Sequence, residues 1–140
     1  MEIKFFIDTK QKVIIEAFRG EISLATIGKA IPYIWNHPDY SPKFDGIIDF
    51  RQSKLLFSKN ELHDLMKTIA EDDKGLKGRA AILVSEPIAA AMATIYGEQM
   101  KDYHSVGIFC AESEVIHFLR IDPAIFNKLN DPKAVIVDLH

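Results

Sequence analysis

Apolar and polar positions alternate at the start of the chain and then change to a helical spacing. Ile3, Phe5 and Ile7 lie at every second position, which predicts a strand, and residues 13–18 form a second strongly apolar segment. The polar residues 8–12 between them are few enough to form the turn of an antiparallel hairpin.

The next segment has the period of a helix. Leu24, Ile27 and Ile31 lie on one helical stripe, and Ser23 before them is a suitable N-cap. Pro32 lies inside this pattern, where it removes a helical hydrogen bond and crowds the preceding turn. We therefore expect a kinked or split helix here.

Strands and helices then alternate to near the end of the chain. Ser58 and Glu61 have the spacing of a capping box at a helix start, and Pro87 suits the first turn of the following helix. The predicted segments are strands over 44–50, 80–84 and 105–110, helices beginning after Ser58 and after Glu86, and a helix over 112–119.

This order predicts an α/β fold. Strands separated by helices become parallel neighbours joined by right-handed crossovers. We expect a single domain over 1–140, with a mainly parallel sheet begun by an antiparallel hairpin and packed by about four helices. Residues 121–140 form a C-terminal extension in this interpretation. Within it, 134–139 has strand character, as an extra edge strand or as an arm that reaches a second subunit.

Composition narrows the class of protein. With 48% hydrophobic and 26% charged residues in 140, the chain matches an ordinary globular protein and not a disordered one. A net charge of −3 gives no electrostatic case for nucleic acid or an anionic membrane. No apolar run approaches the ~20 residues of a membrane span. Cys110 is the only cysteine, which favours a reducing compartment, so we expect a cytoplasmic protein.

The element order over about residues 2–120 resembles the SpoIIAA-like domains, the group that includes STAS domains and the related CRAL-TRIO lipid carriers. The resemblance rests also on the strand 46–50, which contains Asp49, and on Ser58, which opens a helix after a short loop. STAS regulators place a phosphorylatable serine or threonine at this helix start. The resemblance therefore implies phosphorylation or partner docking at Ser58 and Asp49. The segment around Ser58 departs from the Asp-Ser-Ser-Gly type usual in STAS regulators.

Candidate chemistry is otherwise sparse. The chain has no Gly-x-Ser-x-Gly elbow, no zinc-helix pair of histidines and no glycine-rich phosphate loop, so we expect no catalytic set, no metal and no cofactor. Cys110 ends an apolar strand, and we interpret it as a buried, inert thiol.

Two surfaces remain as candidate binding sites. The carboxyl ends of parallel strands form one rim, where Arg51 and Ser85 lie near Asp49 and Tyr96 extends a ligand rim. The second would be a cavity among helix residues, which would favour a ligand-binding protein, whereas a filled core would disfavour one; its lining residues would be Met66, Ile95, Tyr96 and Met100.

The sequence thus favours a non-enzymatic regulatory or protein-interaction module with an unidentified protein partner. The alternative is a small apolar-ligand or lipid-binding protein of the CRAL-TRIO type. Because several strands are apolar on both faces, one face of the sheet could be left exposed, and a homodimer is a further expectation.

Overall fold

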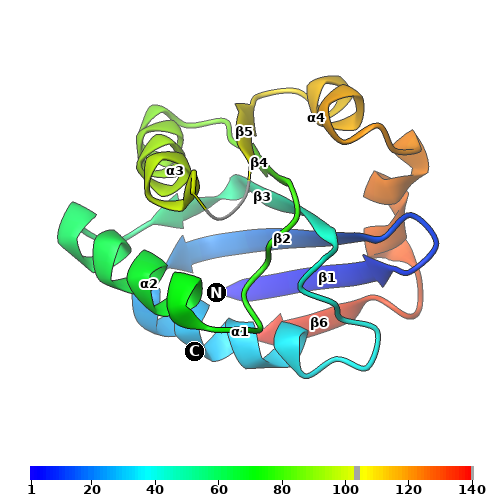
Figure 1. Ribbon diagram of the computed structural model, residues 1–140, viewed down its shortest axis with the longest axis horizontal. Coiled ribbons are helices and arrows are strands. Elements are labelled where there is room, and N and C mark those ends of the chain that lie inside the picture. The colour runs from blue at the N-terminus through cyan, green and yellow to red at the C-terminus, as the bar shows by residue number, and fades with distance from the viewer. Residues whose placement is uncertain (103–104, 140) are drawn as a thin grey trace.

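The chain folds into a sheet with helices on both faces, described by a computed structural model over residues 1–102 and 105–139 (Figure 1). In these ranges the elements are β1 (Glu2–Asp8), β2 (Val13–Ile22), α1 (Leu24–Trp35), β3 (Asp45–Leu55), α2 (Lys59–Glu71), β4 (Ala80–Leu83), α3 (Pro87–Met100), β5 (Val106–Phe109), α4 (Glu112–Leu119), the 3-10 helix η1 (Pro123–Asn130) and β6 (Val135–Asp138).

The strands lie in the order β5-β4-β3-β2-β1-β6. β2, β3, β4 and β5 are parallel neighbours, whereas β1 pairs antiparallel with both β2 and β6. The predicted α/β class is therefore confirmed, with a mainly parallel sheet begun by an antiparallel hairpin. The last segment forms an edge strand of this same sheet, because β6 pairs with β1 over residues 135–138.

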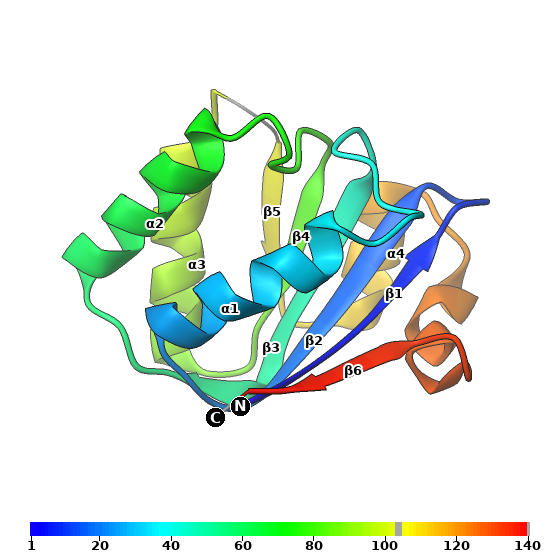
Figure 2. The same cartoon turned by 90° about the horizontal axis from the view of Figure 1, so that it is seen from below.

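Helices cover the two faces unequally (Figure 2). α1, α2 and α3 cover one face, and α4 and η1 cover the other. The alternation along β2 divides its side chains between them: Ile14 and Phe18 belong to the core under α1–α3, while Val13 and Ile15 belong to the core under α4 and η1. The apolar residues on both faces of β2 are thus covered by helices of the same chain, whereas Ile136 on the edge strand β6 is exposed.

The helix caps that the sequence predicts at Ser23 and Ser58 are present in the structure. The Ser23 hydroxyl accepts a hydrogen bond from the Thr26 backbone N–H, and the Ser58 hydroxyl accepts one from the Glu61 N–H. Both are complete capping boxes, because the third helical residue bonds back to the cap. Pro87 occupies the first turn of α3.

Of the kinked or split helix expected at Pro32, the split is wrong, and the kink stays a prediction. α1 runs through Pro32 without interruption from Leu24 to Trp35. Pro32 and Gly28, whose carbonyl loses its helical partner, are both exposed, so water can satisfy that oxygen. Hydration of this oxygen reduces the free-energy cost of having a proline inside the helix.

Strand β3 and the C-terminal region contain more structure than the sequence predicted. β3 continues to Leu55 because residues 52–55 pair in parallel with residues 19–22 of β2. η1 was not predicted, and its Ile125 is fully buried in the core under α4. Within the described ranges, no helix combines the length and the hydropathy needed to cross a bilayer.

Candidate functional site

The predicted rim residues Asp49, Arg51 and Ser85 lie together, joined by hydrogen bonds. The Arg51 guanidinium donates to both Asp49 carboxylate oxygens, at 3.0 Å from Nε and 2.8 Å from Nη2. Nη2 also donates to Glu112 Oε2 at 2.8 Å, and the Ser85 hydroxyl donates to the Arg51 carbonyl oxygen at 3.0 Å. They meet because β4 ends at Leu83, opposite Asp49, while β3 continues past it.

The one cation of this cluster pairs with both of its carboxylates. The hydrogen bonds that Asp49 accepts raise the pKa of the Arg51 guanidinium above its ordinary value. Desolvation by burial lowers this pKa in part, and the hydrogen bond that Glu112 accepts raises it further. Two carboxylates thus share one cation, and Arg51 ties β3 to the start of α4. The cluster is explained as a structural link between two elements.

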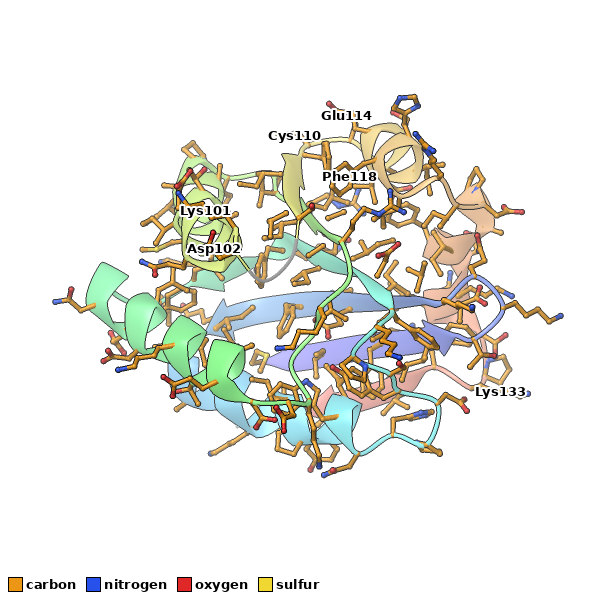
Figure 3. The ribbon with its side chains drawn as sticks, viewed as in Figure 1. Lys101, Asp102, Cys110, Glu114, Phe118 and Lys133 are labelled. Carbon is orange, nitrogen blue, oxygen red and sulfur yellow. The ribbon has the colours of Figure 1, made fainter. Side chains whose placement is uncertain are left out.

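Cys110 is exposed, so the expectation of a buried thiol is wrong. It follows the edge strand β5 directly and lies beside the start of α4, where no further element covers it (Figure 3). Lys101 and Asp102 follow α3 and precede β5, whereas Cys110 follows β5.

Ser58 and Asp49 engage different partners. Ser58 is exposed at the start of α2, and its hydroxyl accepts from Glu61, whereas the Asp49 carboxylate is held by Arg51. Phosphorylation or docking at these residues stays a prediction. The Tyr96 side chain, predicted for the ligand rim, lies outside the described part of the chain, as do those of Met66 and Met100.

A cavity of about 130 Å³ lies on the face of the sheet that α1, α2 and α3 cover. Its walls are almost entirely apolar. They include Ile27, Ala30, Ile31, Ile34 and Trp35 from α1, Leu62, Leu65 and Ile69 from α2, Met92 and Ala93 from α3, and Ile14, Phe18, Ile48, Phe50 and Ile82 from the strands. Ile95, one of the residues named for a cavity that would favour ligand binding, packs against the same core but is not part of the described wall.

Glu16 introduces a carboxylate into this apolar wall. The register of the sheet aligns it with Phe5 on β1 and with Ile48 on β3, and Ile48 is aligned with Ile82 on β4. Along β2 itself, the side chains two residues away on the same face are Ile14 and Phe18. Glu16 is thus surrounded by hydrocarbon in both directions of the sheet.

No hydrogen bond or ion pair joins the Glu16 side chain to any residue in the described part of the chain. The side chain is half-buried, and it lines the cavity. Burial raises the pKa of Glu16 to about 7 from the ordinary 4.5, because the surrounding protein removes water from the charged form. The cavity therefore contains a carboxyl group that is close to its midpoint of titration at neutral pH.

Tyr40 is the other titratable side chain of the described wall, which also contains the Trp35 indole. Its hydroxyl donates a hydrogen bond to the Lys74 carbonyl oxygen, in the segment between α2 and β4. Burial raises the pKa of the Tyr40 phenol, and the charges of Glu16 and Asp72 raise it further. The phenol therefore stays neutral and already uses its only donor.

Sequence reasoning missed Glu16 and Tyr40. The signal for Glu16 was available, because it is a charge in the apolar segment 13–18, at a position that shares a face with Ile14 and Phe18. Tyr40 gives no comparable signal, since its place in the wall depends on how the loop after α1 crosses the sheet.

A chain of known structure has the same fold. No family model and no curated protein matches the sequence. An uncharacterised protein of the DUF3478 family from Shewanella loihica PV-4, described as having a SpoIIAA-like fold, superposes with a TM-score of 0.57. The two chains are 16% identical, and the match covers 84% of this chain and 93% of the other. The SpoIIAA-like fold expected from the sequence is thereby confirmed.

Proposed function

We propose that the protein binds a small, mainly apolar ligand in the cavity between the sheet and α1–α3. This is the ligand-binding alternative raised by the sequence. The observation that carries it is the unfilled volume of about 130 Å³ in an otherwise apolar core. Protein interiors are close-packed, and voids much larger than a water molecule are few.

The size of the cavity indicates the size of the ligand. An apolar cavity of about 150 Å³ in another protein stays dry and binds benzene. At about 130 Å³ this cavity suits one ring or a short branched chain, rather than the acyl chain of a lipid.

We propose binding without catalysis. The polar side-chain groups of the described wall are the Glu16 carboxyl group, the Trp35 indole N–H and the Tyr40 hydroxyl, which is already bonded to Lys74. In the described ranges no three histidine, cysteine, aspartate or glutamate side chains gather into a metal-binding group. A single carboxyl group in hydrocarbon is suited to selecting a ligand.

Toluene titration followed by amide NMR tests the proposal. We expect saturable shifts centred on Ile14, Ala30 and Ala93, which line the cavity. Ala93→Leu projects a larger side chain into the cavity and is expected to abolish these shifts. Ala91→Leu is the matched control, because Ala91 lies on the same helix and is exposed. Shifts scattered over the surface, or no saturation in the unsubstituted protein, would contradict the proposal.

A protein-interaction role at the start of α2 is a second proposal. It is favoured by Leu56, a large apolar side chain that is 48% exposed two residues before Ser58. Phosphosite mapping by mass spectrometry, together with Leu56→Ser in a partner pull-down from the native host, tests it. Phosphate only at other residues, with unchanged capture by Leu56→Ser, would contradict it. Self-association stays a prediction, for light scattering to test.

A further inference from the structure

When ionised, Glu16 offers a ligand one strong hydrogen-bond acceptor, and the N–H and O–H groups of the described wall are those of the Trp35 indole and the Tyr40 phenol. Glu16 has no partner among the described residues, and the Tyr40 hydroxyl donates to Lys74. Apart from the Trp35 indole, the other side chains of the described wall are apolar. A ligand that matches this wall has an apolar body with a single donor group.

Water is a poor occupant of this space. A buried water molecule typically makes about three hydrogen bonds to polar groups of the protein. Here the polar side chains of the described wall are those of Glu16, Trp35 and Tyr40, and the Tyr40 hydroxyl already donates to Lys74. The carboxylate therefore remains incompletely solvated until a better-suited group reaches it.

We propose that the natural ligand carries one protonated amine, which enters the cavity against the Glu16 carboxylate while its apolar body contacts α1–α3. This inference rests on the proposed ligand-binding function and specifies the ligand class. A buried carboxylate is best compensated by a cation that also donates hydrogen bonds. An anionic ligand would place a second negative charge beside Glu16.

Four compounds of similar size separate the contributions to binding. Benzylamine supplies a ring and an ammonium group, benzyl alcohol a ring and a neutral donor, toluene the ring alone, and benzoate a ring with an anion. Each is titrated at pH 8 by NMR or calorimetry into the unsubstituted protein, Glu16→Gln and Glu21→Gln. Glu21 is the control because it lies on the same strand and is exposed.

We expect benzylamine to bind about ten- to a hundredfold more tightly than toluene, the range typical of a hydrogen bond to a charged group. Glu16→Gln should remove that preference and leave toluene binding in place, while Glu21→Gln should retain it. Equal affinities for benzylamine and toluene, or tighter binding of benzyl alcohol or benzoate, would overturn the inference but leave ligand binding intact. Failure of all four compounds to bind would overturn the proposed function itself.

The pH dependence of binding gives a second test that needs no substitution. Among the described residues of the wall, Tyr40 is the other titratable group, and it stays neutral because its pKa is raised. Because the pKa of Glu16 is about 7, most Glu16 side chains are ionised at pH 8 and only a small fraction are ionised at pH 6. Only the ionised form binds the ammonium group, so benzylamine should bind about tenfold more weakly at pH 6 than at pH 8. Unchanged benzylamine affinity across this range would also overturn the inference.

Discussion

Glu16 and Tyr40 line the same apolar cavity, and of the two only Tyr40 has a hydrogen-bond partner in the described part of the chain. The negative charge of Glu16 contributes to the raised pKa of the tyrosine, so the two groups are electrostatically coupled. The cavity thus combines a neutral phenol that is held in place with a carboxyl group that is free to respond to a ligand.

Glu16 should make the protein less stable as the pH rises. The pKa of Glu16 is about 7 in the folded protein and 4.5 as the ordinary value, so the folded state binds more protons between these values. The free energy of unfolding therefore falls from pH 4.5 to pH 7, by up to about 3 kcal/mol. Glu16→Leu should remove this loss.

Urea unfolding of the unsubstituted protein, Glu16→Leu and Glu21→Gln at pH 5 and pH 8 measures the effect. The stability advantage of Glu16→Leu should be larger at pH 8, whereas Glu21→Gln, at an exposed position of the same strand, should show no such change. An advantage of equal size at both pH values would show that Glu16 is not desolvated.

Ile82→Ala should enlarge the cavity and destabilise the protein. Ile82 is 1% exposed and lines the cavity opposite α3. The expected loss is about 2–5 kcal/mol, the range for large-to-small substitutions in a core. Ligand titrations should then show that 1-methylnaphthalene, too large for the original cavity, gains affinity relative to toluene. A loss of stability with no gain for the larger compound would indicate that the walls collapse.

Arg51→Met should cost more stability than Glu112→Gln. Removing Arg51 leaves the buried Asp49 carboxylate without its cation, at an expected cost of about 2–3 kcal/mol. Glu112 is more exposed, and its loss leaves the Arg51–Asp49 pair in place, so the expected cost is below about 1 kcal/mol. Denaturant midpoints of the two variants give the comparison, and the reverse order would contradict the structural role assigned to Arg51.

Ser58→Ala should destabilise α2 by about 1 kcal/mol, because the Glu61 backbone N–H loses its acceptor. Ser58→Asp should retain most of the stability, since aspartate also caps and its charge lies at the helix N-terminus. Thermal unfolding of the two variants measures this difference. Equal melting temperatures for Ser58→Ala and the unsubstituted protein would show that the cap does not contribute.

Local signals allowed the helix starts to be predicted. Ser23 and Ser58 cap helices through residues three positions away, so the information lies within a short stretch of sequence. The extent of β3 could not be found in this way, because residues 52–55 become a strand only by pairing with β2. η1 likewise depends on burial of Ile125 against a distant part of the sheet.

The candidate site was less predictable than the fold. The rim residues Asp49, Arg51 and Ser85 could be placed together from strand order alone, because parallel strands bring their carboxyl ends to one edge. A cavity forms where side chains from several elements leave space unfilled. Its presence depends on how α1–α3 are placed over the sheet, which the sequence pattern does not specify. Glu16 carried a signal in its strand, but its meaning depends on the cavity beside it.

A crystal structure of the protein soaked with bromobenzene tests the central claim most directly, since the anomalous signal of bromine locates the compound. We predict one ordered site between the sheet and α1–α3, with the ring in contact with Ala93 and Ile82. A cavity closed by side chains, with bromine only at the surface, would contradict the account.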